Sequence, residues 1–192
     1  MKKLVIKTAI ITLVAIIGLA SLFLGITALF FPKTMAKICD TVGADNCALK
    51  NYVRVYDKSG DLEDLFVVVS KCPSSDDHEL RYEYLKKFVD NKKFEEFITE
   101  KEGGTTFTTK EFVLGLYMES CYETKGIYDS IYLAQDLVIK YGYTEYGPFS
   151  VLISFENLEE EHKELIKSGI NAIYVRLDTL GKAYADRDIA LL

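Results

Sequence analysis

The chain has 192 residues, which is enough for one domain of ordinary size, and its formal net charge is −6. The charge is unevenly distributed, because the first 33 residues carry +4 and residues 34–192 therefore carry −10. An acidic body argues against nucleic acid as a partner, since phosphate binding needs a basic face. It also argues against flat adsorption onto anionic lipid.

The first predicted element is a membrane span over residues 9–31, which contain no charged side chain and follow a basic tail, residues 1–8. At about 1.5 Å rise per residue, this run is long enough to cross the ~30 Å hydrocarbon core of a bilayer. Pro32 is expected to end the helix. A cleaved signal peptide is the alternative, but its apolar region is normally only about 7–15 residues long.

The orientation of the span depends on the charges beside it. Three basic side chains lie on each side: Lys2, Lys3 and Lys7 before it, and Lys33, Lys37 and Lys50 after it. The α-amino group adds a positive charge to the N-terminal side and favours a cytoplasmic N-terminus, as in a signal anchor. We therefore expect a single-pass protein of the cell membrane, in contact with lipid through residues 9–31, whose body lies outside the cytoplasm.

The body is predicted to be all-α. A juxtamembrane helix or linker is expected over residues 32–45, and after it turn signals recur about every 12 to 22 residues, the length of a helix plus a short turn. The β-branched run at residues 66–70 lies between helix-like signals, so it is predicted to be helical. Residues 149–155 are also rich in β-branched and aromatic side chains, and here helix and strand both remain open.

Two stretches separated by 66 residues resemble each other. "YDKSGDLEDLF" begins at Tyr56 and "YETKGIYDSIYL" begins at Tyr122, and a weaker copy, "FVDNKKFEEFI", begins at Phe88. The expected turn is at Gly60 in the copy from Tyr56, at Lys92 in the copy from Phe88, and at Gly126 in the copy from Tyr122. A period of 32 to 34 residues with two helices per unit is typical of an α-solenoid.

This pattern resembles the tetratricopeptide repeat family, whose unit is a 34-residue helical hairpin with an aromatic residue near the end of its first helix and a glycine at the turn. "YDKSGDLED" carries the resemblance best. The family's tryptophan is absent, and the small alanine of its second helix is replaced by Leu65, Phe97 and Ile131. The resemblance is degenerate and covers residues 46–143, which leaves residues 144–192 as a helical cap. The alternative fold is a non-repetitive helical bundle.

The resemblance implies a partner-binding groove. In the family, two positions of each first helix, four residues apart, face the concave side; in this chain they are Lys50 and Arg54, Tyr82 and Lys86, and Leu116 and Ser120. Three of these six side chains are basic in an acidic body. Such a groove suits a protein or peptide partner with acidic side chains or a free C-terminal carboxylate.

The four cysteines allow one specific expectation. If the first hairpin is antiparallel about residue 59.5, Cys47 and Cys72 lie at the same height, and a disulfide joins them provided that their Cβ atoms face each other. Four reduced and mostly buried cysteines are the alternative.

Motifs for catalysis are mostly absent from the sequence. It has no glycine-rich phosphate loop, and the Glu159–His162 pair lacks the second copy that two-iron bundles use. We therefore expect no enzyme, catalytic residue, metal or cofactor, but a membrane-anchored scaffold or accessory subunit of a membrane complex. An anchored or secreted enzyme such as a cell-wall hydrolase, and a structural subunit that oligomerises through its span, are the alternatives. A deep polar cleft with two close carboxylates would favour the enzyme.

Overall fold

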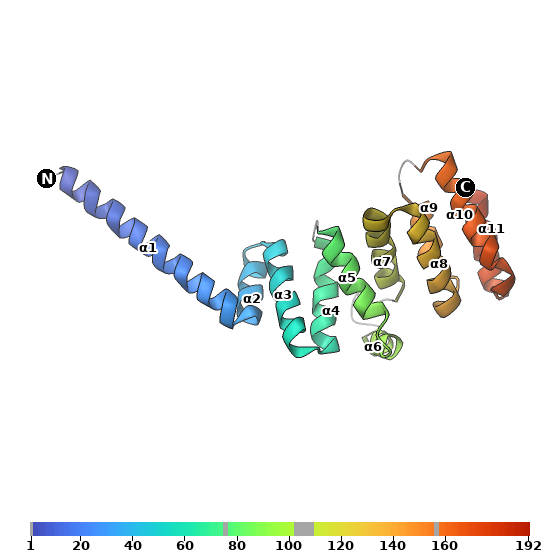
Figure 1. Cartoon of the computed structure of the whole chain (residues 1–192), viewed down its shortest axis with the longest axis horizontal. Helices are drawn as coiled ribbons and strands as arrows, with labels where there is room; N and C mark the ends of the chain where they lie inside the picture. Colours follow the sequence, from blue (N-terminus) through green and yellow to red (C-terminus); the bar gives the residue numbers. More distant parts are fainter. Residues whose placement is uncertain (1, 75–76, 102–109, 156–157) are drawn as a thin grey trace. The chain divides into compact units, whose positions relative to one another are not determined.

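The computed structural model describes residues 2–74, 77–101, 110–155 and 158–192 (Figure 1). Within these residues the protein consists of helices and turns and contains no strand, so the all-α prediction is confirmed. The chain divides into two compact units, residues 1–75 and 76–192. This boundary falls inside the region expected to form one series of repeats, so each unit is described by itself.

Unit 1 begins with α1, Lys2–Phe30, and its window Ile10–Thr27 is long and apolar enough to cross a membrane. Large apolar side chains along this window are exposed. A signal sequence near an N-terminus can also contain a helix this long and apolar, so the helix alone does not distinguish a span from a signal. Phe31 leaves the helical conformation, and Pro32 occupies the first turn of α2, Pro32–Thr41, where its missing N–H costs nothing.

The rest of unit 1 is α3, Asp45–Ser59, then α4, Leu62–Lys71, and a short 3₁₀ turn, Cys72–Ser74. α3 packs against both α2 and α4. The β-branched run at residues 66–70 lies in α4, as predicted. Leu65, Val68 and Val69 are buried at i, i+3 and i+4, so burial along one stripe outweighs the β-branched preference for strand.

The disulfide of unit 1 differs from the expected one. Cys47 pairs with Cys39 across the turn between α2 and α3, and the expected Cys47–Cys72 bridge is wrong. Cys72 is a buried thiol 3.4 Å from the carbonyl oxygen of Val68. The predicted bridge rested only on the equal distance of Cys47 and Cys72 from the turn between α3 and α4. α3 also packs against α2, and Cys47 faces that neighbour.

Unit 2 contains seven α-helices among its described residues. They are α5, His78–Val89; α6, Phe94–Lys101; α7, Lys110–Lys125; α8, Ile127–Tyr141; α9, Pro148–Ile153; α10, Glu160–Ile173; and α11, Thr179–Leu191, which follows a 3₁₀ turn, Tyr174–Arg176. Residues 148–153 are thus helical, which decides most of the stretch left open between helix and strand. The core contains large, fully buried side chains such as Tyr117, Phe149 and Ile170.

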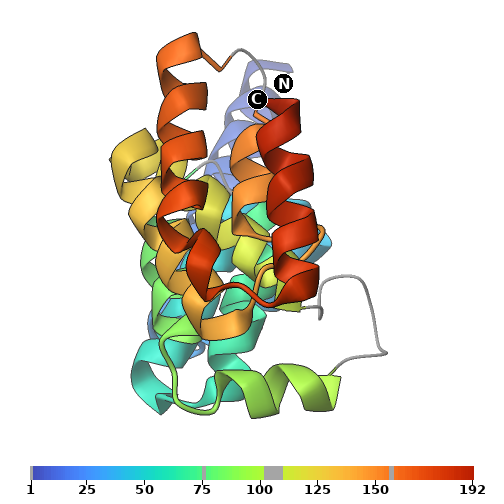
Figure 2. The same ribbon diagram turned by 90° about the vertical axis from the view of Figure 1, so that its right-hand side faces the viewer.

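The three expected turns are formed in different ways. Gly60 ends α3 with φ +63°, and Gly126 joins α7 to α8 with φ +82°, so both glycines adopt backbone conformations that other residues rarely take. Lys92 is exposed in the turn between α5 and α6. Here α6 lies across the end of α5 instead of running back beside it (Figures 1 and 2).

Aromatic packing accounts for the crosswise position of α6. The Phe88 ring meets the Phe94 and Phe97 rings edge-on, with centroids 5.3 Å and 5.8 Å apart. Phe94 also contacts Tyr141 of α8, at 5.6 Å. α5 packs mainly along α7. The middle copy therefore departs from the antiparallel hairpin of a regular repeat.

The two units carry opposite net charge. Residues 1–75 contain nine basic and six acidic side chains, a net +3, whereas residues 76–192 contain 14 basic and 23 acidic side chains, a net −9. Any recognition site on unit 2 therefore lies in a negative field.

Candidate functional site

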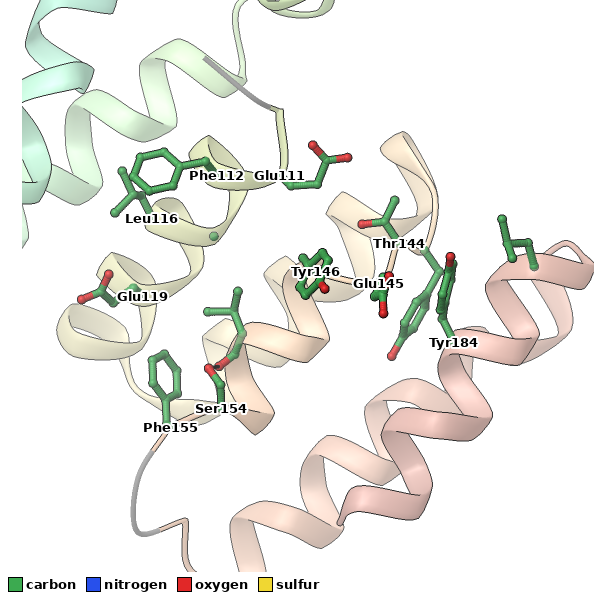
Figure 3. Close-up of a pocket in the computed structure, with 14 residues that line it drawn as sticks. Glu111, Phe112, Leu116, Glu119, Thr144, Glu145, Tyr146, Ser154, Phe155 and Tyr184 are labelled. Carbon is green, nitrogen blue, oxygen red and sulfur yellow. Dashed lines mark hydrogen bonds between the residues drawn. The ribbon is translucent and has the colours of Figure 1, made fainter. Parts of the chain in front are cut away.

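Unit 2 contains a cleft of about 900 Å³ between α7, α9 and α11 (Figure 3). Its volume lies in the upper part of the range that binding pockets usually show. The described lining residues are Glu111, Phe112, Gly115, Leu116 and Glu119 of α7; Tyr143, Thr144, Glu145 and Tyr146 of the loop between α8 and α9; Val151, Ser154 and Phe155 in and after α9; and Leu180 and Tyr184 of α11.

One face of α7 forms a wall of the cleft. Its five lining residues, 111, 112, 115, 116 and 119, follow the helical period, which places them on one side of the helix. The other sides of α7 are covered by α5 and α8. Gly115 lies against α9, since a Cβ built there would be in van der Waals contact with Cγ2 of Val151, at 3.4 Å. The cleft therefore has a closely packed floor.

The lining is mainly aromatic and aliphatic. Phe112, Tyr143, Tyr146, Phe155 and Tyr184 all contribute rings. The Phe155 ring is fixed by stacking on Tyr122, with centroids 4.5 Å apart. Tyr146, by contrast, is 71% exposed. An exposed ring among half-buried ones, beside a packed floor, is the kind of surface that binding partners bury.

Glu119 is held in place by an arginine behind it. Nη2 of Arg81 lies 3.2 Å from Oε2 of Glu119, and Arg81 is only 5% exposed. A carboxylate can accept about four hydrogen bonds, and this ion pair uses one of them. The Glu119 side chain remains 42% exposed, so a ligand in the cleft can reach it.

Glu145 is held in a similar way by Arg187 of α11. Nη1 of Arg187 lies 3.2 Å from Oε1 of Glu145, and its Nη2 donates to the backbone oxygen of Glu145 at 2.8 Å. Arg187 is fixed in turn by Asp188, at 2.7 Å. The hydrogen bond from Arg187 to Asp188 raises the pKa of the guanidinium, so the arginine stays charged.

Asp188 is the buried centre of this network. It accepts hydrogen bonds from the Tyr143 hydroxyl at 2.9 Å and from the Ser150 hydroxyl at 3.0 Å. Burial, together with the charge of Asp188, raises the pKa of Tyr143, so its hydroxyl remains protonated and keeps donating. The network joins α11 to α9 and to the loop before it, and so fixes one side of the cleft.

The charges at the cleft do not cancel. Among the described residues three carboxylates line the cleft, Glu111, Glu119 and Glu145. Arg81 pairs with Glu119, and Arg187 is shared between Glu145 and the buried Asp188 behind the lining, so the four carboxylates and two arginines together leave an excess of two negative charges. No lysine, arginine or histidine is among the described lining residues. The cleft therefore favours a positively charged ligand.

The six expected groove residues are divided between the two units. Lys50 and Arg54 are exposed on α3 in unit 1, and the other four belong to unit 2. Ser120 is 0% exposed and its hydroxyl donates to the Leu116 carbonyl oxygen at 2.8 Å, so including it in the groove was wrong. Ser120 is buried because α5 and α8 cover the sides of α7 that do not line the cleft.

Two of the remaining expected residues lie on α5. Tyr82 is half-buried against the Tyr117 ring, with centroids 5.5 Å apart. Lys86 is exposed, and its ammonium group lies 3.8 Å from Asp90. Leu116 alone of the six lines the cleft.

Most of the cleft was missed because its walls are distant in sequence. Residues 144–155 and α11 fall in the region expected to be only a helical cap, residues 144–192. The aromatic-rich "YGYTEYGPF", Tyr141 to Phe149, was the available signal. Within the described part of the chain, no group of three or more His, Cys, Asp or Glu side chains is arranged to hold a metal ion.

The fold and the cleft define an all-helical protein with an apolar N-terminal helix and an acidic cleft in its second unit. No protein-family model matches the chain, no curated protein matches its sequence, and no solved structure matches its fold.

Proposed function

We propose that the protein is a membrane-anchored docking protein, a scaffold or accessory subunit of a membrane complex, whose second unit binds a segment of a partner protein in the cleft. The observation that carries this proposal is the cleft itself, where the exposed Tyr146 ring and three half-buried aromatic rings lie beside carboxylates paired with Arg81 and Arg187. Fixed polar groups around an apolar surface reduce the ordering cost of binding.

The proposal places residues 9–31 in the membrane. The length of the apolar run and the exposed side chains of α1 support it. The Cys39–Cys47 disulfide supports a body outside the cytoplasm, because disulfides persist mainly in oxidising compartments. A cytoplasmic N-terminus follows from that orientation.

The proposal also treats the α3–α4 and α7–α8 hairpins as diverged tetratricopeptide-like copies. Their turns at Gly60 and Gly126 support this origin, and under the proposal the middle copy, with its crosswise α6, is the most diverged of the three. A partner with acidic side chains or a C-terminal carboxylate would bind elsewhere, at a basic site such as Lys50 and Arg54, since the cleft is negative.

A hydrolase is less well supported. Glu111 and Glu119 are eight residues apart on α7, so their Cα atoms are about 12 Å apart along the helix and the side chains project from different turns. Glu119 and Glu145 are both engaged by arginines. Their positions suit recognition better than proton transfer.

Photo-crosslinking in native membranes tests the proposal. A photoreactive residue replaces Tyr146, which lines the cleft, or Tyr132, which is similarly exposed at 67% on α8 but is not a lining residue. We expect one defined partner adduct from position 146 and none from position 132. The adduct should disappear when Leu180, on the α11 side of the cleft, is changed to Arg. Equal yields from both positions, or an adduct that survives Leu180→Arg, would contradict docking in the cleft.

A further inference from the structure

We infer that the occupant of the cleft is a protein segment that carries lysine or arginine next to bulky apolar side chains. This inference rests on the proposed docking function and specifies the chemistry of the partner. It follows from three properties of the described lining: the excess of negative charge, the position of the carboxylates, and the apolar area between them.

The carboxylates are placed to bind cations at separate points. Glu111 and Glu119 lie two turns apart along α7, and Glu145 lies on the loop before α9. In Figure 3 these side chains surround the open part of the cleft, and Tyr146 lies between the α7 residues and Tyr184. A single small cation would meet one of these carboxylates, whereas a segment with spaced basic residues can meet more than one.

Ion pairs to arginine hold two of these carboxylates at the cleft, and this makes the cleft selective against acidic ligands. Glu119 and Glu145 cannot turn away from the cleft without breaking ion pairs to Arg81 and Arg187. An acidic ligand would therefore meet fixed negative charge, and like charges at close range are costly. The aromatic rings add to the preference, because the face of a ring attracts an ammonium or guanidinium group.

The apolar part of the lining requires more than charge from the occupant. Leu180 is 60% exposed and Tyr146 is 71% exposed, next to the buried floor that includes Leu116. Covering such surfaces contributes roughly 25 cal/mol per Å² of apolar area. A purely basic, hydrophilic segment would leave this area in water. The occupant therefore combines both kinds of side chain.

The wider field of unit 2 excludes the other macromolecular surfaces. With a net charge of −9, the unit repels nucleic acid and anionic lipid headgroups. Among its described residues there is also no strand edge to which an extended peptide could add by backbone pairing. Recognition must therefore come from side chains, and these select for positive charge and apolar bulk.

Selection from a random library tests the inference. The full chain in nanodiscs is used to select binders from a displayed library of short random peptides. Binders are then measured against Leu180→Arg, which blocks the cleft, and against Val175→Arg, a matched control that is 83% exposed in the 3₁₀ turn outside the lining. We expect binders that depend on the cleft to be enriched in Lys or Arg together with Leu, Phe, Tyr or Trp. Leu180→Arg should weaken them at least tenfold, and Val175→Arg should leave them unchanged.

The outcomes separate this inference from the proposed function. Cleft-dependent binders that are neutral or acidic would overturn the cationic chemistry, and the crosslink at position 146 would still support docking. Binding only of small cations, with no peptide selected, would overturn a protein segment as occupant. Failure of both the selection and the crosslink would overturn the proposed function as well.

Discussion

The two units are stabilised and charged in different ways. Unit 1, net +3, is held by the Cys39–Cys47 disulfide and by Lys71, which lies 2.9 Å from Asp40. Unit 2, net −9, is held by a large aromatic core and by the buried Asp188 network beside an open cleft. Under the proposed function, unit 1 connects the apolar helix to the rest of the chain and unit 2 provides the recognition surface.

The largest expected effect concerns the core of unit 2. Phe149 is fully buried and stacks on Tyr143, with ring centroids 5.9 Å apart. Phe149→Ala should lower the unfolding free energy of unit 2 by about 3–5 kcal/mol, because it leaves a cavity under the cleft. Hydrogen exchange with mass spectrometry should show loss of protection in residues 110–192 and unchanged protection in α3 and α4.

The control for this prediction is Tyr128→Ala, which removes an exposed ring from α8 and should have little effect. Equal loss of protection in both units on Phe149→Ala would mean that they fold as one cooperative body. The comparison between the units would then be wrong.

The next effect belongs to unit 1. Removing the disulfide with Cys39→Ser and Cys47→Ser should cost about 2.5 kcal/mol, from the chain entropy of a loop whose ends are eight residues apart. Chemical reduction of the wild-type chain should lower the melting temperature of unit 1 to that of the variant and leave unit 2 unchanged. A variant that melts like the oxidised wild type would argue against a stabilising role for this bridge.

The turn glycines allow the same substitution in each unit. Gly60→Val and Gly126→Val should each cost about 1 kcal/mol or more, because both positions have positive φ. Asparagine sharpens the comparison. Gly60 is in the left-handed helical region, which Asn tolerates, whereas Gly126 has ψ −176°, a combination essentially restricted to glycine. Melting temperatures should therefore fall more for Gly126→Asn than for Gly60→Asn, and an equal fall would contradict the two turn geometries.

The smallest expected effect is the acid sensitivity of unit 1. Burial raises the pKa of Asp40, but hydrogen bonds from Lys71 and Tyr52 outweigh it and lower the pKa below its usual value. The stabilisation is therefore present above about pH 4, and it is lost as the pH falls through the lowered pKa. Its size is at most about 1 kcal/mol for such a partly exposed pair.

The test of this effect compares urea unfolding of unit 1 at pH 7 and pH 3. Asp40→Asn should be less stable than wild type at pH 7 and should lose less stability on acidification. Lys71→Met should reduce the acid sensitivity in the same way. An unchanged pH dependence in both variants would show that the Asp40–Lys71 pair does not contribute.

The helices were predictable because their signals are local. The apolar run of α1, the capping Asp61 before α4 and the glycines after α3 and α7 are each read within a few residues. The cleft was not predictable in this way. It depends on Tyr143 and Ser150 meeting Asp188 some 45 and 38 residues later. The crosswise position of α6, which follows from the packing of the Phe88 and Phe94 rings, was not predictable either. The position of Ser120 likewise depends on which neighbours cover α7.

The central claim, a positively charged segment held in the acidic cleft of unit 2, is tested most directly by a double-mutant cycle. The cycle combines Glu111→Gln with replacement of each Lys or Arg of a selected cleft-binding peptide by norleucine, on the full chain in nanodiscs. Glu123→Gln is the control, since Glu123 is exposed on the same helix but does not line the cleft. We predict that Glu111→Gln weakens binding about fivefold and that one basic position couples to it by about 1 kcal/mol. No coupling at any basic position, or equal weakening by Glu123→Gln, would contradict the account.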